Sequence, residues 1–192
     1  TNFHGWQKQP NGRTVQGEVE HVLRFIAGYD VPVNGTSRTD AGVHALGQCA
    51  SFNWDNPLPT NKLANIMNRR FGAGGLGRSG LPGDIRVISA VEVPSDFHAR
   101  FSCHGKTYKY VVDRSGDIFE RNYVYQYGYE LDHEAMRVAA KAAVGTHDFA
   151  SFQTAGGIPR ETTVRTVTDI AISDEGERTI IRVTGDGFLY NM

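Results

Sequence analysis

The 192-residue sequence predicts an α+β fold whose strands pair mostly antiparallel. Apolar residues recur at three- and four-residue spacing from Val15 to Ile26, which is typical of one face of a helix. Residues 164–172 and 178–184 read as two strands of a hairpin around an acidic turn. Each half of the chain combines strands with one or two helices, which is the pattern of the α+β class.

The first half, residues 1–96, is predicted to carry two helices. Thr14 is a suitable N-cap for the first, and Gly28 a suitable terminator, because glycine adopts the left-handed conformation found just after helices. Thr60 is predicted to cap the second, whose inward-facing residues are Leu63, Ile66 and Met67. Strands are expected over residues 1–6, 43–52 and 84–93.

The second half, residues 97–192, is predicted to open with a strand over residues 100–113. A helix is expected to start at Leu131-Asp132 and to end at Gly145, with an apolar stripe of Met136, Ala139, Ala140 and Ala143. The glycine-rich segment 72–83 matches the spacing of a dinucleotide-binding fingerprint. That motif must leave a strand and open a helix, whereas this segment leaves a helix and leads to Pro82, so we expect only a loop.

Composition indicates a globular protein with 40% hydrophobic and 21% charged residues. No apolar run approaches the roughly 20 residues that span a bilayer, so we expect no membrane segment. Cys49 and Cys103 are too few for a disulfide framework, which favours a reducing, cytoplasmic setting. The first residues look like the interior of a strand, so the chain is expected to lack an upstream piece; a targeting segment there would make the protein organellar.

A net charge of −1 gives no overall sign of a nucleic-acid ligand, but the charges are segregated. Residues 66–88 contain four arginines against one aspartate, and residues 100–114 contain four basic residues against one aspartate. Acidic residues gather elsewhere, as in residues 174–177. Such segregation permits a basic groove on a nearly neutral protein, although a charge run is also what a solvated face looks like.

The strongest candidate for chemistry lies in residues 37–44, which read Ser-Arg-Thr-Asp-Ala-Gly-Val-His. The small residues Ala41 and Gly42 leave room for another molecule to approach Asp40. Arg38 is expected to keep that carboxylate ionised as an ion-pair partner. An ionised, accessible carboxylate suits nucleophilic or general-base work. The alternative is an ordinary turn, because Asp and Gly side by side are common in turns.

Other site classes find little support. None of the seven histidines pairs with another at helical spacing and the two cysteines are far apart, which disfavours a metal site. His44 is read as structural. The segment Lys106-Thr107-Tyr108-Lys109-Tyr110 is expected to place cations on one strand face and rings on the other, a surface suited to stacking a base and holding a phosphate. Core tyrosines beside a solvated lysine edge would produce the same pattern.

Eight motifs occur in an order that resembles the TruA family of tRNA pseudouridine synthases across nearly the whole chain. The Arg-Thr-Asp-Ala-Gly-Val-His block is the most specific of them. The others are residues 3–10, 14–18, 97–101, 106–110, 145–149, 163–166 and 187–192. Ser37 stands where the family usually has glycine, the segment 72–83 is longer than usual, and the family continues beyond Met192 with an arginine and a helix.

The resemblance implies two related α+β halves joined around a central RNA-binding cleft. It implies isomerisation of uridine to pseudouridine in the anticodon stem-loop region of tRNA, by a homodimer that uses neither metal nor organic cofactor. Asp40 then corresponds to the catalytic aspartate, Arg38 to the arginine of the same block, and Tyr108 to the tyrosine that stacks on the target base. Phe188 is expected to line the pocket and to help exclude water.

The chemistry leaves three routes open for Asp40: attack on the sugar carbon, addition to the uracil ring, or stabilisation of positive charge on the sugar. Among these we expect it to act as the nucleophile. Stacking on Tyr108 is worth about 1–3 kcal/mol, which offsets part of the cost of unstacking the base. Two alternatives are a non-catalytic RNA-binding module, which gives Asp40 no task, and a small-molecule enzyme, which would show no affinity for RNA.

Overall fold

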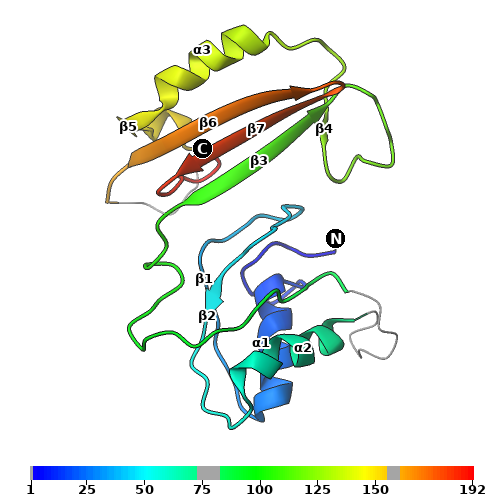
Figure 1. Ribbon diagram of the computed structural model, residues 1–192, viewed down its shortest axis with the longest axis vertical. Helices are drawn as coiled ribbons and strands as arrows, with labels where there is room; N and C mark the ends of the chain where they lie inside the picture. Colours follow the sequence, from blue (N-terminus) through cyan, green and yellow to red (C-terminus); the bar gives the residue numbers. More distant parts are fainter. Residues whose placement is uncertain (1, 73–82, 155–160) are drawn as a thin grey trace. The chain divides into compact units, whose positions relative to one another are not determined.

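The computed structural model describes residues 2–72, 83–154 and 161–192. The chain divides into two compact units, Thr1–Cys103 and His104–Met192, and each is described on its own below (Figure 1). The first unit contains α1 (Val15–Ala27), β1 (Asn34–Gly35), β2 (Ala50–Ser51) and α2 (Thr60–Phe71). The second contains β3 (Lys106–Asp113), β4 (Tyr125–Gln126), α3 (His133–Ala143), β5 (Gly145–Asp148), the 3-10 helix η1 (Ala150–Phe152), β6 (Val164–Glu175) and β7 (Arg178–Gly185).

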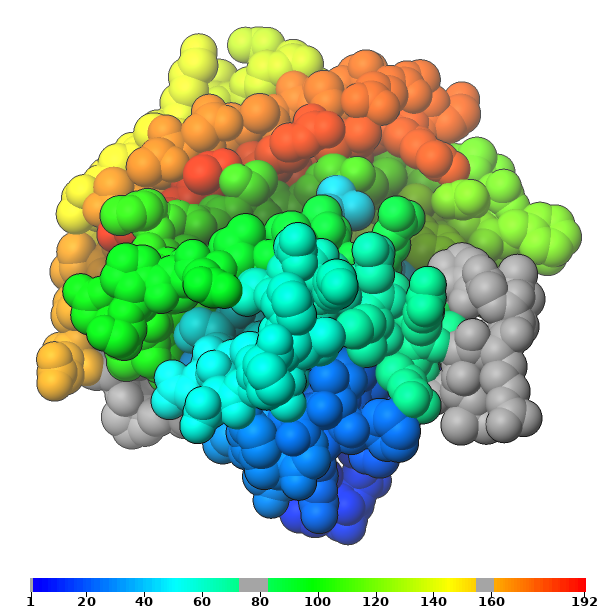
Figure 2. Space-filling view, turned by 60° about the horizontal axis from the view of Figure 1, so that its bottom comes forward, coloured from blue at the N-terminus to red at the C-terminus, as the bar shows by residue number. Residues whose placement is uncertain are grey.

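Helix α1 begins and ends where its sequence signals predict. The Thr14 side chain accepts a hydrogen bond from the backbone N–H of Gly17 at 3.2 Å, and Gly28 closes the helix with a φ of 84°. Its inner face buries Val22 and Leu23, while the opposite face lies at the surface, where it appears in blue in Figure 2. The predicted first helix is therefore confirmed.

The core of the first unit forms where α1 packs beside α2 (Figure 1). Leu63 and Met67 of α2 are buried, as predicted, and Ile66 is half-buried. The predicted cap is wrong: Pro59 holds that position without a side-chain hydrogen bond, and the hydroxyl of Thr60 donates to Glu92 at 2.7 Å instead. The buried cluster consists of Trp6, Val22, Leu23, Val31, Val33, Leu63, Met67 and Phe71.

The three strands predicted for this unit are wrong over most or all of their length. Of residues 43–52, only Ala50–Ser51 pair, with Asn34–Gly35, and residues 84–93 form no strand. An alternating pattern makes a strand only where a neighbouring backbone supplies hydrogen bonds. For Val87 the partner is a side chain, because the Asn68 amide donates to its carbonyl at 2.8 Å and accepts from its N–H at 2.7 Å. Residues 2–6 also lie outside any strand.

The second unit is built on a five-stranded sheet with the order β4-β3-β7-β6-β5. Strands β3, β7, β6 and β5 pair antiparallel and only β4 runs parallel to its neighbour, so the α+β class with mostly antiparallel pairing is confirmed. The predicted hairpin is present and slightly longer, with Gly176 in its turn at a φ of 74°. The predicted strand over 100–113 begins only at Lys106.

Helix α3 follows its prediction to within two residues. The Asp132 side chain caps it by accepting from the N–H of Ala135 at 2.9 Å, and the helix ends at Ala143, two residues before Gly145. His133 fixes its first turn on the sheet, because its Nε2 lies 2.8 Å from Thr179 Oγ1 and its Nδ1 lies 3.3 Å from Asp174. The predicted glycine-rich loop lies, over residues 73–82, outside the described residues.

Candidate active site

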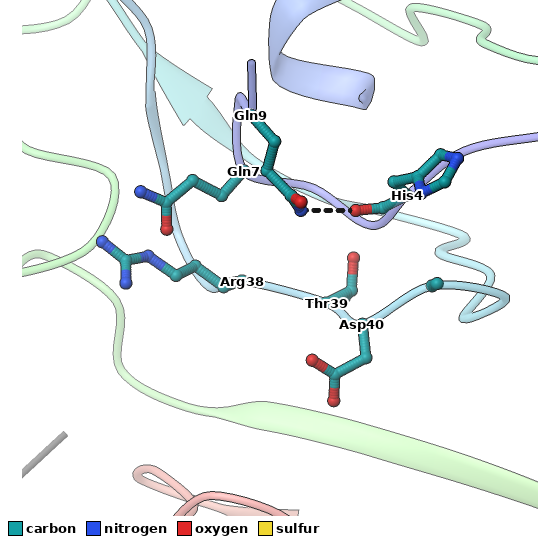
Figure 3. A pocket seen from close by; sticks show the side chains of 7 residues that line it. His4, Gln7, Gln9, Arg38, Thr39 and Asp40 are labelled. Atoms are coloured by element: carbon teal, nitrogen blue, oxygen red, sulfur yellow. Dashed lines mark hydrogen bonds between the residues drawn. The ribbon is translucent and has the colours of Figure 1, made fainter. Parts of the chain in front are cut away.

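A pocket of about 360 Å³ in the first unit contains two of the predicted site residues, Asp40 and Arg38 (Figure 3). Its volume is in the range of small-ligand sites. The lining residues come from two segments far apart in sequence: His4, Gln7, Gln9, Arg38, Thr39, Asp40 and Ala41. Asp40 and Arg38 therefore share one concave surface with the N-terminal segment of the chain.

The Asp40 carboxylate stands at the start of a turn. The N–H of Val43 donates to the Asp40 carbonyl at 3.2 Å, and Gly42 has a φ of 82°, a conformation that favours glycine. The Asp40 side chain is exposed, so water and ligands reach it directly. The two interpretations of this motif are therefore compatible: the segment forms a turn, and its aspartate is accessible.

Arg38 and Asp40 both lie among the described residues, and they do not form the predicted ion pair. In Figure 3 the side chains of Arg38 and Asp40 leave the segment that carries them in different directions. Both side chains are exposed, so water solvates each charge and little free energy is gained by holding two flexible groups together. Arg38 remains available to a negatively charged ligand.

The N-terminal segment forms the second wall of the pocket, which sequence reasoning missed. The N–H of Trp6 donates to the carbonyl of Thr39 at 2.9 Å. Gly5 has a φ of 82°, and a Cβ added there would lie 2.6 Å from the Thr39 carbonyl oxygen. Only glycine permits this approach. The signals available in the sequence were this glycine between His4 and Trp6 and the motif over residues 3–10 that contains it.

Further contacts tie this segment to the core. The Trp6 side chain is 7% exposed, and a Cβ added at Gly35 would lie 2.5 Å from its ring. The backbone N–H groups of Val15 and Gln16 donate to the carbonyls of Gly5 and Trp6, at 3.2 and 3.0 Å. The Asp40 loop is therefore held through the N-terminal segment by the first turn of α1.

The other two predicted site residues, Tyr108 and Phe188, lie together in the second unit. Tyr108 is on β3, opposite Val183 of β7, and Phe188 follows the end of β7. Their ring centroids are 5.1 Å apart with planes at 87°, an edge-to-face contact. Both side chains are half-buried, and Leu189 beside them is buried against Val167. The pair presents a partly accessible aromatic surface.

The predicted separation of lysines and tyrosines on β3 is wrong for Lys106. Strand β3 pairs with β7 without interruption from Lys106 to Asp113, and side chains alternate between the faces of a strand. Lys106 therefore shares a face with Tyr108 and Tyr110, and Lys109 lies on the other face, directly opposite Arg182. Both members of that cationic pair are exposed.

Two carboxylates of the second unit have a lowered pKa, and both hold the sheet together. A hydrogen bond from Ser115 lowers the pKa of buried Asp113, helped by those from Arg178 at 3.1 Å and Gln126 at 3.1 Å. Hydrogen bonds from Thr163 and from the N–H of Ala150 lower the pKa of Asp148. These groups link neighbouring strands, so we assign them a structural task.

The described residues offer neither a metal-binding cluster nor a membrane-spanning helix. Among the residues that the structure describes, no group of three or more His, Cys, Asp or Glu side chains is arranged to hold a metal ion. Within residues 2–72, 83–154 and 161–192, no helix is both long enough and apolar enough to cross a membrane. The Asp40 pocket of the first unit and the Tyr108–Phe188 pair of the second unit are the two candidate sites, one in each unit.

Comparison with known proteins identifies the family. A family model described as tRNA pseudouridine synthase matches residues 139–192. The chain is 43% identical to tRNA pseudouridine synthase A of Clostridium acetobutylicum, over 100% of this chain and 75% of that protein. It is 46% identical to the protein of the same name from Halalkalibacterium halodurans, over 100% of this chain and 70% of the relative. The chain belongs to the tRNA pseudouridine synthase A family.

Proposed function

We propose that the chain converts uridine to pseudouridine in the anticodon stem-loop region of tRNA, with Asp40 as the catalytic nucleophile. The observation that carries this proposal is the Asp40 pocket, in which two exposed residues of opposite charge, Asp40 and Arg38, line one concave surface. Membership of a family whose relatives are named tRNA pseudouridine synthase A supports the substrate and the reaction. The enzyme is accordingly an isomerase.

The reaction rearranges one bond and consumes no second substrate. An oxygen of Asp40 forms a bond to C1′ of the ribose while the bond from C1′ to N1 of uracil breaks, and N1 takes the electron pair. The detached base turns, C5 attacks C1′, and Asp40 leaves as a carboxylate. C5 then loses its proton and N1 gains one, so that substrate and product have the same composition. This balance requires neither a metal nor an organic cofactor.

Tyr108 and Phe188 are proposed to hold the extruded base. Their edge-to-face contact leaves a partly accessible ring surface on which a planar base can stack. Arg38, which has no ion-pair partner among the described residues, is proposed to bind a backbone phosphate or to fill the gap left by the flipped nucleotide. Asp40 and Tyr108 act on the same nucleotide in this scheme.

The scheme therefore requires two related halves, residues 1–96 and 97–192, that meet around a central RNA-binding cleft. We further propose that the protein works in the cytoplasm as a homodimer. The bacterial sources of the relatives and the presence of only two cysteines, neither of them in a disulfide, support the cytoplasmic setting. Size-exclusion chromatography with light scattering tests the dimer.

The decisive experiment compares wild-type protein with Asp40→Ala on uridine-containing tRNA transcripts. Pseudouridine is mapped at nucleotide resolution, and tRNA affinity is measured in parallel. The enzyme proposal predicts modification within the anticodon stem-loop region by the wild type, and loss of product with retained tRNA binding in the variant. If the wild type binds tRNA and forms no pseudouridine, the chain is instead an RNA-binding module.

A further inference from the structure

We infer that the side-chain amide of Gln7 holds the imide edge of the target uracil while the base turns between bond cleavage and bond formation. The inference rests on the proposed function and adds the residue that retains the detached base. It starts from the second wall of the Asp40 pocket, to which the N-terminal segment contributes His4, Gln7 and Gln9.

Gln7 is the wall residue whose amide is available to a ligand. Its side chain is exposed and has no hydrogen-bond partner within the described part of the chain. The neighbouring Gln9 amide, by contrast, donates to the carbonyl of His4 at 2.9 Å, the dashed line in Figure 3. In the same view Gln7 extends toward the guanidinium end of Arg38.

The backbone that carries Gln7 is fixed to the Asp40 loop. Trp6, the preceding residue, is buried and donates its N–H to Thr39, the residue before Asp40, at 2.9 Å. On the other side, the N–H of Lys8 donates to the Gln16 side chain of α1 at 3.1 Å. Gln7 is therefore held between two anchored neighbours. This anchoring keeps its side chain beside the pocket.

An amide complements uracil at its imide edge. The oxygen of Gln7 can accept from N3–H of the base, and its nitrogen can donate to the adjacent carbonyl oxygen. A half-turn of uracil about the axis through N3 and C6 exchanges N1 with C5 and the O2 carbonyl with the O4 carbonyl. N3–H stays in place. The same amide can therefore make the same two hydrogen bonds before and after the turn that the isomerisation needs.

The test follows a single turnover of tRNA with enzyme in excess, using wild type and Gln7→Ala. Loss of two hydrogen bonds is expected to slow pseudouridine formation by about 10- to 100-fold. Free uracil should also appear: water supplies a hydroxyl to C1′, N1 leaves with a proton, and an abasic ribose remains in the tRNA. A structural defect would slow the reaction without releasing uracil.

Two further variants make the result specific. Gln7→Glu keeps the acceptor oxygen and loses the donor, so its rate should lie between those of wild type and Gln7→Ala. Lys8→Ala is the matched control, because its ammonium group pairs with Glu20 at 3.0 Å and does not line the pocket. It should convert uridine at the wild-type rate and release no uracil.

The outcomes separate the inference from the function on which it rests. A Gln7→Ala protein that forms pseudouridine at the wild-type rate and releases no uracil overturns the inference, provided that Asp40→Ala is inactive in the same assay. A wild-type protein that forms no pseudouridine overturns the proposed function itself.

Discussion

The two units position their candidate site residues by different means. In the first unit Asp40 lies on an irregular loop, and that loop is held by the backbone of the distant N-terminal segment, through Trp6 N–H to Thr39 and the close approach of Gly5. In the second unit Tyr108 lies on an eight-residue strand with continuous pairing to β7. The position of the proposed nucleophile thus depends on a few specific contacts, and that of the proposed stacking residue on a regular sheet.

The largest effect is expected where the loop depends on one glycine. Gly5→Ala places a Cβ 2.6 Å from the Thr39 carbonyl, so the Asp40 loop must shift. We expect kcat to fall about 10- to 100-fold, because small displacements of a reacting group are costly. The backbone strain should also lower the free energy of unfolding by about 1–3 kcal/mol. Steady-state kinetics and urea unfolding measure the two effects.

Gly28→Ala is the matched control for this comparison. Gly28 has a φ of 84°, close to that of Gly5, but a Cβ added there meets nothing within 4 Å. This variant should lose similar stability and keep the wild-type kcat. Equal kcat losses in the two variants would show that backbone strain, and not displacement of the Asp40 loop, limits activity.

A smaller effect is expected from the carboxylate that stabilises the sheet of the second unit. The pKa of Asp113 is lowered in the folded protein, chiefly by Ser115. Its contribution to stability is therefore fully present above the unfolded pKa of about 3.9, and is lost as the pH falls through the lower folded pKa. Asp113→Asn should flatten the acid side of the stability profile, measured by urea unfolding between about pH 5 and pH 2.

Asp30→Asn provides the reference for this profile, because the Asp30 side chain is 80% exposed and lies outside the sheet. It should follow the wild-type curve. Parallel curves for wild type and Asp113→Asn would mean that the hydrogen bonds of Asp113 do not favour its charged form.

The smallest effect concerns the two lysines of β3. Affinity for tRNA should fall steeply with added salt, because phosphate contacts release counterions. Lys106 shares a face with Tyr108 and Lys109 does not. Lys106→Ala should therefore reduce the slope of log affinity against log salt by about 0.7–0.9, and Lys109→Ala should leave it unchanged. The reverse order would place the RNA on the opposite face of the sheet.

Local signals in the sequence predicted the elements that depend on nearby residues. Helix α1 follows from Thr14, Gly28 and a stripe within the helix itself, and the β6–β7 hairpin from its turn. The predictions of strands over 43–52 and 84–93 were wrong because the alternation of apolar and polar residues does not show whether a partner strand is present. At Val87 that partner is the side chain of Asn68, which no pattern within 84–93 could reveal.

The candidate site shows the same limit. Asp40 and Arg38 stand in one motif, and both line one pocket, yet their proximity in sequence does not produce the expected ion pair. Gln7 was missed as a pocket residue, and Gly5 as its support, because their place beside the Asp40 loop becomes visible only when Trp6 is seen bonded to Thr39. The motif in the sequence predicts Asp40 as the nucleophile, but it does not reveal the residues that hold the Asp40 loop.

The most direct test of the account is the single-turnover rate of uridine isomerisation by Asp40→Asn, with Asp30→Asn as the matched control. Asparagine preserves the shape of the side chain and removes the nucleophilic oxygen anion. If Asp40 is the nucleophile, Asp40→Asn loses about 1,000-fold or more in rate while binding tRNA as the wild type does, and Asp30→Asn keeps full activity. Wild-type turnover by Asp40→Asn would contradict it.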